Sequence, residues 1–461
     1  MTTSLDRLLP ATERALLYRL ATAQAEGRAP SIAAGVAREG EVVWTGVHPP
    51  HDADGTEGPG NDTQYRVGSI TKTFTAILVM RLRDEGLLDL QDPLEKHLPG
   101  TGVGEVTVFQ LLGHGAGVRA ETPPPWWERT PGSLRPELAD VLGEEPLLGP
   151  PGQRHHYSNP GYALLGSLVE AVRGESWEDV LRREILEPLG LTRTSVRPQA
   201  PAATGWAVHP WADAVLPEPL EDLGVMAPAG QLWSTVGDLC RFGVFLAEGD
   251  DRVLSAASVQ EMRTPSVPAE DGEVTYGLGV QIVRGGGRTF VGHAGSLPGF
   301  LAVVWVSVAD GVAAAAVANA TSGPAIGPLG AELVEIVATA EPRIPGPWRP
   351  LPEVDQDLLA LAGPWYWGPQ PLGLRLLADG GLELQPLRGG GRGSRFTAAG
   401  DGTWTGLDGY YTGETLRVVR REDGSVLHLD LGSFVLTRAP YDPDAGVPGG
   451  VDPDGWRGLE N

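Results

Sequence analysis

A mostly apolar stretch that follows a serine and a lysine constrains this chain more than any other feature of its sequence. Residues 74–82 are apolar on nearly every side of a helix, and Gly86 provides a stop signal. A helix that is apolar all round is expected inside a protein. Ser69 opens the stretch, and Lys72 follows one helical turn later on the same face. The sequence therefore predicts a buried helix in which the lysine amine can reach the serine hydroxyl.

Burying this lysine requires an explanation, because a desolvated and unpaired ammonium is costly unless its pKa falls. A lysine that releases its proton readily can activate a serine nucleophile, since a free hydroxyl is hardly ionised at neutral pH. The alternative is that Ser69 only caps the helix and Lys72 extends to the surface. The S-x-x-K motif alone does not decide between the two.

Two further segments can complete a site around Ser69. Tyr157 and Asn159 lie two residues apart in a loop ahead of an amphipathic helix over 163–172, so an extended loop would point both side chains the same way. A phenol can transfer a proton, and an amide can hold a fixed hydrogen bond. Residues 276–283 are predicted to form one strand, and a later predicted strand, 289–296, contains His293-Ala294-Gly295.

In this order, Ser69-x-x-Lys72, Tyr157-x-Asn159 and His293-Ala294-Gly295 resemble the motifs of the class C β-lactamase and D-Ala-D-Ala carboxypeptidase superfamily of serine hydrolases. The resemblance covers roughly residues 12–340, and the joint order is specific although each motif alone is weak. It implies a mixed α/β fold in which the N-terminal hairpin and the late strands form an antiparallel sheet. Helices would cover both faces of that sheet, beside an all-helical region.

For the chemistry, the resemblance implies that Ser69 is acylated while Lys72 and Tyr157 share the general-base and general-acid work. Because Tyr157 would lie beside an ammonium, we expect its pKa to be lowered.

The resemblance also implies a substrate-binding set. Asn159 would orient the substrate and the lysine, and His293, Gly295 and Ser296 would line the other side. The backbone N–H groups of Ser69 and Ser296 would form an oxyanion hole.

The third motif departs from the Lys-Thr-Gly of the lactamases. A lysine there offers a permanent cation to a substrate carboxylate, whereas His293 is mostly neutral at pH 7 and Ala294 has no hydroxyl. Members of the superfamily with His-x-Gly include esterases, D-aminopeptidases and some D-Ala carboxypeptidases, so the resemblance implies hydrolysis of an ester or a small amide, including one that contains a D-amino acid. Weak β-lactamase or D-Ala-D-Ala carboxypeptidase activity stays open, as does a catalytically inactive sensing or scaffold protein.

Other motif interpretations are less consistent with the sequence. His114, in a glycine loop, resembles a lipase oxyanion loop, but no serine lies on the G-x-S-x-G elbow that such enzymes need, so we expect a packed loop histidine. Trp126 and Trp127, in a proline-rich segment, either form an aromatic wall for a substrate or anchor the loop, and anchoring is the favoured interpretation. His155 and His156 alternate in direction in an extended segment and lack further ligands at suitable spacing, so neither a metal nor another cofactor is expected.

Charge and hydropathy limit the possible partners. The net charge of −24 opposes binding to nucleic acid, so a small molecule or short peptide is the expected partner, with the oligomeric state open. The longest apolar run, 300–320, is divided by Asp310-Gly311, which predicts a hairpin rather than a membrane span. The first residues lack the pattern of a signal peptide, and a cytoplasmic location is expected.

Composition divides the chain. The resemblance places a β-lactamase-like hydrolase domain at 1–343, followed by a proline-rich linker at 344–352. Short apolar runs separated by glycine and aspartate turns predict a small antiparallel barrel or sandwich of seven or eight strands at 353–440, which resembles the lipocalin-like modules often appended to this family. Residues 441–461 are expected to be disordered.

Overall fold

The chain forms two compact units, Met1–Ile344 and Pro345–Asn461, in a computed structural model. The C-terminal tail, residues 441–461, is expected to be disordered. Apart from residue 441, these residues lie outside the part of the chain that the structure describes. The structure describes residues 7–49, 58–129, 136–266, 274–388, 390–400 and 402–441.

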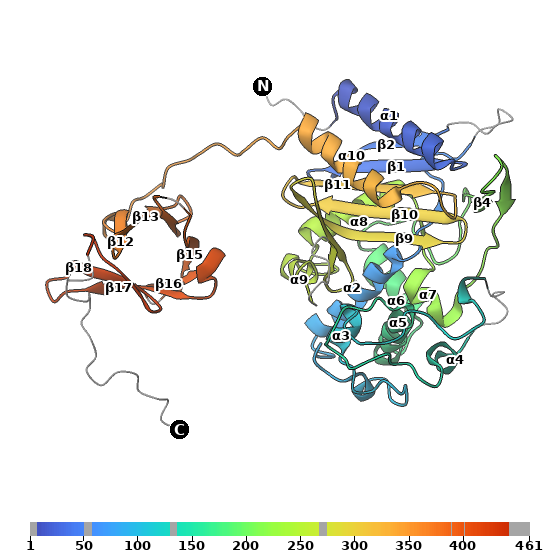
Figure 1. Cartoon of the computed structure of the whole chain (residues 1–461), viewed down its shortest axis with the longest axis horizontal. Helices are drawn as coiled ribbons and strands as arrows, with labels where there is room; N and C mark the ends of the chain where they lie inside the picture. The colour runs from blue at the N-terminus through green and yellow to red at the C-terminus, as the bar shows by residue number, and fades with distance from the viewer. Residues whose placement is uncertain are drawn as a thin grey trace. The chain divides into compact units, whose positions relative to one another are not determined.

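A seven-stranded antiparallel sheet forms the centre of the first unit (Figure 1), with strand order β2-β1-β11-β10-β9-β8-β7. The N-terminal hairpin joins the late strands in one sheet, as the sequence predicted, through pairing of Ile32 with Ala318. The strands are β1 (Ile32–Arg38), β2 (Glu41–His48), β7 (Val274–Tyr276), β8 (Gln281–Gly285), β9 (Arg288–Leu297), β10 (Phe300–Ser307) and β11 (Val312–Ala318).

Both faces of this sheet are covered by helices. In β1, Ala33 packs into the core on the side of α8 (Val236–Glu248), whereas Ala34 packs on the side of α1 (Pro10–Gly27) and α10 (Ile326–Ala340). Figure 1 shows α1 and α10 together on one side of the sheet and α8 on the other. Successive strand residues point to opposite faces, so a strand that is apolar throughout needs cover on both sides. The predicted mixed α/β fold is confirmed.

The helix after Ser69 connects the sheet to a helical region. This helix, α2 (Ile70–Asp84), contacts β9 and also packs against α5 (Asn159–Arg173) and α7 (Ala227–Gly230). It begins directly after Ser69 and ends shortly before Gly86, as the sequence predicted. The remaining helices of the region are α3 (Val108–Leu112), α4 (Leu138–Leu142) and α6 (Trp177–Leu181), with α9 (Ala256–Met262) beside the sheet.

One predicted strand is in fact two. Residues 276–283 were expected to form a single strand, but β7 and β8 pair with each other across a turn that contains Gly279. Gly279 has φ +78°, and a Cβ there would lie 2.2 Å from the Cβ of Ala76 in α2. The turn therefore follows from the close approach of α2, which the local residue pattern does not reveal.

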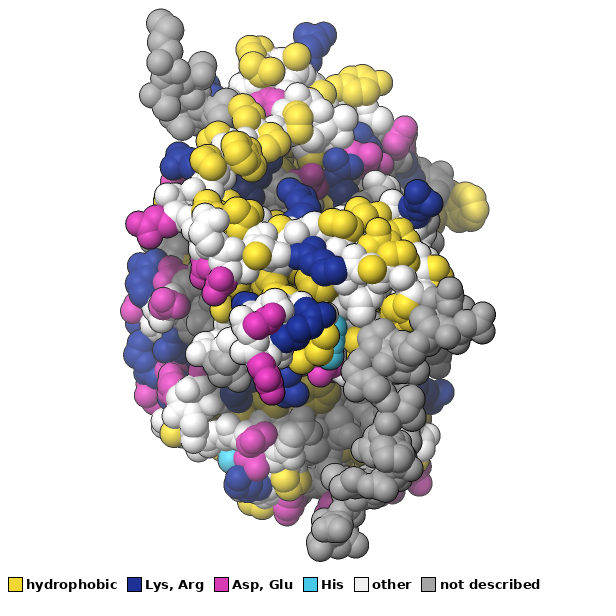
Figure 2. All heavy atoms as spheres, turned by 90° about the vertical axis from the view of Figure 1, so that its left-hand side faces the viewer, with side chains coloured by type: hydrophobic (Ala, Val, Ile, Leu, Met, Phe, Trp, Pro, Cys, Tyr) yellow, Lys and Arg dark blue, Asp and Glu magenta, His cyan; other side chains and the backbone are white. Residues whose placement is uncertain are grey.

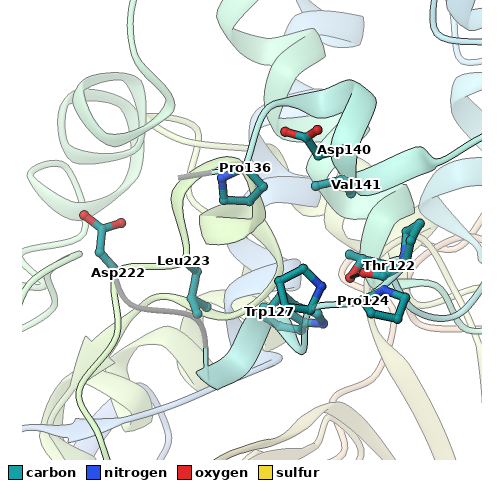
Figure 3. Close-up of a pocket in the computed structure, with 10 residues that line it drawn as sticks. Thr122, Pro124, Trp127, Pro136, Asp140, Val141, Asp222 and Leu223 are labelled. Atoms are coloured by element: carbon teal, nitrogen blue, oxygen red, sulfur yellow. Dashed lines mark hydrogen bonds between the residues drawn. The ribbon is translucent and has the colours of Figure 1, made fainter. Parts of the chain in front are cut away.

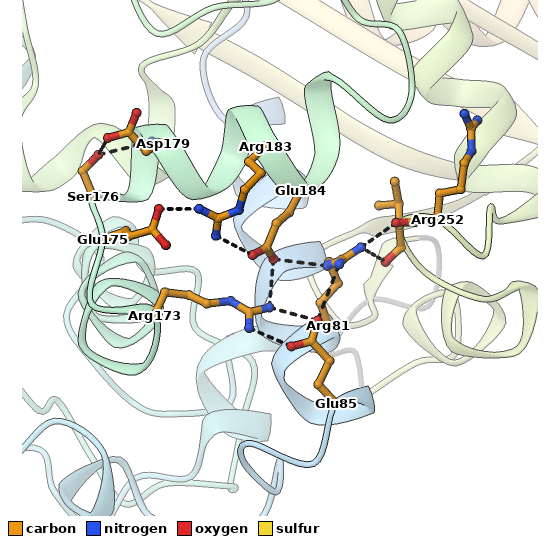
Figure 4. Close-up of polar contacts among 10 residues, drawn as sticks. Arg81, Glu85, Arg173, Glu175, Ser176, Asp179, Arg183, Glu184 and Arg252 are labelled. Carbon is orange, nitrogen blue, oxygen red and sulfur yellow. Dashed lines mark hydrogen bonds and ion pairs between the residues drawn. The ribbon is translucent and has the colours of Figure 1, made fainter.

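A buried ion-pair cluster joins the helices behind α2 (Figure 4). Glu184 lies in the π-helical segment η3 (Arg182–Leu186) and is 7 % exposed. Its carboxylate accepts hydrogen bonds from Arg81 of α2 (3.2 Å), Arg173 of α5 (2.9 Å) and Arg183 (2.8 Å). One carboxylate thus holds three elements together.

We expect Glu184→Ala to lower the free energy of unfolding by about 2 kcal/mol, because Arg81 and Arg173 are partly buried and keep only the more exposed carboxylate of Glu85 as a common partner. Urea unfolding followed by circular dichroism measures this. Glu187→Ala is the matched control, since Glu187 forms only an exposed pair with Arg182 and should change stability by less than about 0.5 kcal/mol. Equal effects of the two variants would contradict the assignment.

The second unit is an eight-stranded antiparallel sheet that nearly closes into a barrel. Its strands follow chain order, and a bridge between Tyr366 and Thr437 brings the first strand back to the segment after the last. Trp365, Phe396 and Leu416 are among its buried core. A barrel, one of the two predicted forms, is therefore the one observed. The strands are β12 (Gly363–Trp367), β13 (Gln370–Leu376), β14 (Leu382–Pro386), β15 (Ser394–Ala398), β16 (Thr403–Gly406), β17 (Thr415–Arg420), β18 (Val426–Leu431) and β19 (Phe434–Leu436).

The surface carries charges of both signs. Figure 2 shows acidic and basic side chains interspersed with hydrophobic ones over the face it displays. Within the described ranges, no helix combines the length and the apolar character needed to cross a bilayer.

Candidate active site

Ser69 and Lys72 lie together at the start of α2. Ser69 is the N-cap residue, yet its side chain makes no capping hydrogen bond. Instead, Lys72 Nζ donates to Ser69 Oγ over 3.0 Å. Lys72 is 0 % exposed, so its side chain does not reach the surface. The geometry therefore contradicts the interpretation of this motif as a helix cap followed by a surface lysine.

The lysine amine is held at a fixed point. Besides Ser69, Lys72 Nζ donates to Asn159 Oδ1 (2.7 Å) and to the carbonyl oxygen of Ala229 in α7 (2.8 Å). Burial lowers the pKa of Lys72 to about 7, and the nearby carboxylates of Glu121 and Glu128 oppose this shift. A lysine with this pKa is about half deprotonated near neutrality and can act as a base there.

Tyr157 is held from both sides by His114. The His114 carbonyl accepts from the backbone N–H of His156 (2.7 Å), and His114 Nδ1 accepts from the backbone N–H of Ser158 (3.1 Å). The ring centroids of His114 and Tyr157 are 4.2 Å apart. The histidine of the glycine loop is thus a packed residue, as expected, and it fixes the loop that carries the phenol.

The expected lowering of the Tyr157 pKa is wrong. Burial raises the pKa of Tyr157, and this outweighs the effect of a hydrogen bond with the Ser69 side chain, which lowers it. Lys72 Nζ lies 5.0 Å from the centre of the Tyr157 ring, but it is itself mostly desolvated and loses its charge near pH 7. The phenol therefore keeps its proton at neutral pH and is a donor rather than a base.

Asn159 is placed by a helix start and not by an extended turn. It is the first residue of α5, after the N-cap Ser158, whose hydroxyl accepts from the N–H of Gly161 over 3.0 Å. Asn159 Nδ2 donates to Glu121 Oε1 (2.7 Å), which leaves Oδ1 directed at Lys72. Sequence reasoning missed Glu121, because a single acidic residue in a proline-rich loop carries no motif.

Strand β9 runs directly against the start of α2. A Cβ on Gly295 would lie 2.0 Å from the carbonyl oxygen of Val67 and 2.9 Å from the backbone nitrogen of Ser69. Gly68, at φ +53°, approaches equally closely, because a Cβ there would lie 2.7 Å from the backbone nitrogen of Ser296. The two backbone N–H groups predicted to form the oxyanion hole are thus flanked by glycines at a close backbone contact.

His293 uses both ring nitrogens inside the protein. Nδ1 lies 2.5 Å from the Ala294 carbonyl, which can only accept, so Nδ1 carries the proton. Nε2 then accepts from the Tyr276 hydroxyl over 2.8 Å. Burial and the nearby Lys72 lower the pKa of His293 to about 3, so the ring is neutral at pH 7. Its visible contribution is to fix β9, and neither ring nitrogen is left for a ligand.

A cleft of about 540 Å³ lies over the serine. Among the described residues, no group of three or more His, Cys, Asp or Glu side chains is arranged to hold a metal ion. Lys72 lies behind the cleft wall. The other six residues predicted from the motifs line the cleft together: Ser69, Tyr157, Asn159, His293, Gly295 and Ser296.

Trp127 lines both this cleft and a second pocket of about 360 Å³, which is shown in Figure 3. The Trp127 side chain is buried and donates from Nε1 to Glu121 Oε2 over 2.8 Å, as an anchoring residue would, but it also lines the cleft, and Trp126 is 57 % exposed. Figure 3 shows Asp140 and Asp222 on opposite sides of the second pocket, around proline side chains.

The fold and this site together define a β-lactamase-like protein with an S-x-x-K serine. Residues 18–339 match the Beta-lactamase family, and the chain belongs to that family. Residues 354–438 match a domain of unknown function, DUF7586. The barrel therefore has a family of its own, and its predicted likeness to lipocalins stays a prediction.

Two curated relatives illustrate the extent of the match. "Beta-lactamase-like protein 2" of Dictyostelium discoideum is 29% identical over 54% of this chain and 48% of its own length. "Penicillin-binding protein 4" of Amycolatopsis lactamdurans is 30% identical over 56% of this chain and 72% of its own length. The match thus spans about half of the first relative and most of the second.

Solved structures support the same fold. The octameric penicillin-binding protein homologue from Pyrococcus abyssi has a TM-score of 0.63 at 23% identity, over 92% of this chain and 99% of that chain. A D-stereospecific amidohydrolase from Streptomyces has a TM-score of 0.57 at 29% identity, over 71% of this chain and 98% of that chain.

Proposed function

We propose that this chain is a serine hydrolase that cleaves an ester or a small amide through an acyl-enzyme on Ser69. The observation that supports this most strongly is the hydrogen bond between Ser69 Oγ and a fully buried Lys72 whose pKa is about 7. A buried amine that is partly neutral at the operating pH is suited to take the serine proton. If Ser69 served only as a helix cap, a buried amine beside its hydroxyl would not be needed.

In the proposed reaction, neutral Lys72 accepts the Ser69 proton as Oγ attacks the carbonyl carbon. The backbone N–H groups of Ser69 and Ser296 stabilise the tetrahedral oxyanion. The protonated phenol of Tyr157 donates to the leaving group as its bond to the carbonyl carbon breaks, and Tyr157 regains a proton from the Lys72 ammonium. Water then attacks the acyl carbon, Lys72 accepts its proton, and Ser69 is reprotonated as the acid is released.

The other cleft residues position these groups. Asn159, oriented by Glu121, keeps Lys72 directed at the serine and presents its amide beside the cleft. Gly295 allows β9 to approach Ser69, so that a substrate can lie along Ser296. We include His293 for its role in fixing this strand.

A small amide, including a D-amino-acid amide, is the substrate type that the similarity to a D-stereospecific amidohydrolase favours. An ester remains an equal candidate, because the same acylation chemistry serves both. The β barrel at 353–440 is proposed to be a separate module joined through the proline-rich linker 344–352.

A fluorophosphonate probe tests the proposal. We expect intact-mass analysis to show one adduct, and peptide mapping to place it on Ser69. A panel of short-chain p-nitrophenyl esters, D-amino-acid amides and a chromogenic cephalosporin then ranks the substrate classes. If the folded chain takes no label at Ser69, the inactive sensing or scaffold protein becomes the better interpretation.

The pH dependence of acylation follows from Lys72. Because only the neutral amine accepts a proton, kcat/KM for an uncharged ester should be low at pH 5 and rise to a plateau above an apparent pKa of about 7. The raised pKa of Tyr157 predicts no fall of the plateau up to pH 9. Stopped-flow acylation rates across this range measure the profile, and a flat profile from pH 5 to 9 would rule out Lys72 as the base.

Gly295→Ala should disturb the oxyanion hole. The added methyl group would meet the Val67 carbonyl at 2.0 Å and force β9 away from Ser69, so we expect kcat/KM to fall about 100-fold. Gly285→Ala in β8 is the matched control, because a Cβ there has no neighbour within 4 Å. Ester hydrolysis by both variants measures the effect, and a near-normal rate in Gly295→Ala would place the oxyanion donors elsewhere.

A further inference from the structure

The charges around the cleft are of one sign. Glu121 and Glu128 both line it, and among the described residues that line it there is no lysine or arginine. Glu121 is exposed to solvent while its two oxygens accept from Asn159 and Trp127. Glu128 accepts from Trp126 Nε1 over 2.9 Å. Both carboxylates therefore have hydrogen-bond partners and line the same cleft as Ser69.

The cations near the cleft are already held by acceptors within the protein. Arg66, whose charge acts on Glu128, is buried and donates to the Glu221 carbonyl and to Gln231, and Arg129 pairs with Glu218. Lys72 directs its hydrogen bonds at three protein acceptors, Ser69 Oγ, Asn159 Oδ1 and the Ala229 carbonyl. The His293 ring is neutral and bonded at both nitrogens, as described above. Among the described residues that line the cleft, a substrate carboxylate would meet two glutamates and no lysine or arginine, whereas a substrate ammonium would meet two acceptors with unused lone pairs.

The two glutamates also affect each other. Burial raises the pKa of Glu128, and the neighbouring charge of Glu121 adds to this rise. A cation placed between or beside the two carboxylates relieves that repulsion, which increases its affinity beyond that of a single pair.

We propose that this cleft selects acyl groups that carry an ammonium next to the scissile carbonyl, as in amides or esters of amino acids with a free amino group, and that Glu121 and Glu128 bind this ammonium. The proposal rests on the proposed serine hydrolase function. Compounds that carry a carboxylate in place of this ammonium are therefore expected to be poor substrates.

Three p-nitroanilides of nearly equal shape test this on the full chain. Alanyl p-nitroanilide, in both D and L forms, carries the ammonium, isobutyryl p-nitroanilide replaces it with a methyl group, and methylmalonyl p-nitroanilide replaces it with a carboxylate. We expect kcat/KM for the better alanyl isomer to exceed that for the isobutyryl compound by at least about tenfold, with the methylmalonyl compound lowest. This preference should weaken as NaCl is raised, because salt screens the charges.

Variants then connect the preference to the residues. In Glu128→Gln and in Glu121→Gln, the ratio of alanyl to isobutyryl kcat/KM should fall about tenfold each. Glu105→Gln removes an exposed carboxylate that does not line the cleft, and should leave the ratio unchanged.

The outcomes separate the two proposals. If the isobutyryl compound is hydrolysed through Ser69 and the ratio is near one, the ammonium proposal is overturned and the hydrolase stands. A ratio above ten that neither glutamate variant lowers also overturns it, because the selectivity then comes from elsewhere. If Ser69 reacts with neither the anilides nor a fluorophosphonate, both proposals fail.

Discussion

Ser69→Ala should lower kcat for the best ester or amide substrate by at least about 10⁴-fold, because the variant removes the hydroxyl on which the proposed acyl-enzyme forms. The variant should nevertheless fold normally. The Ser69 side chain makes no capping hydrogen bond to α2, and Lys72 keeps its bonds to Asn159 and Ala229 when the hydroxyl is removed. Steady-state rates together with a thermal unfolding midpoint measure both parts.

The two readouts distinguish a nucleophile from a structural cap. A helix-capping serine would show the opposite pattern, with a loss of about 1 kcal/mol in stability and little change in rate. Ser158→Ala is a useful comparison, since the Ser158 hydroxyl does cap α5 by accepting from Gly161. A Ser69→Ala protein that turns over within tenfold of the native rate would end the acyl-enzyme proposal.

Lys72→Met should lower kcat/KM by about 10³-fold to 10⁴-fold, because methionine fills a similar volume but cannot accept the serine proton. Two buried acceptors, Asn159 Oδ1 and the Ala229 carbonyl, lose their donor. The variant also no longer has to bury an amine, which favours the folded state and opposes that loss. We therefore expect the free energy of unfolding to fall by no more than about 3 kcal/mol. Pre-steady-state acylation with an activated ester separates the rate effect from substrate binding.

The residual activity of Lys72→Met should also lose the pH dependence with an apparent pKa of about 7 that the native chain is expected to show. Fluorophosphonate labelling of the variant should slow in parallel with its turnover. If acylation stays fast and only hydrolysis of the acyl-enzyme slows, Lys72 serves the second step alone, and another group must accept the Ser69 proton.

The strand-paired parts of the fold could be predicted from local residue patterns. The Asp310-Gly311 turn between two apolar runs specifies the hairpin β10–β11, because turn preference and burial act within a few residues of each other. The single predicted strand at 276–283 became two strands, because the contact of Gly279 with α2 joins residues far apart in the sequence.

The candidate site divides in the same way. The motif residues were predictable, because S-x-x-K places Ser69 and Lys72 one helical turn apart wherever the helix lies. Glu121 was not predictable, since its importance comes only from the amide of Asn159 lying within 2.7 Å. The fixed ring of His293 likewise depends on Tyr276, which belongs to a different strand.

The sequence by itself determined which serine, lysine and tyrosine form the candidate site and the order in which they occur, because these depend on residue type and short spacing. Only the tertiary structure decided the protonation of those groups and the charge of the cleft. The lysine loses its proton near neutrality and the phenol keeps its own, since both are desolvated by distant segments that fold over them. Desolvation is a property of the assembled surroundings, and no short stretch of residues contains it.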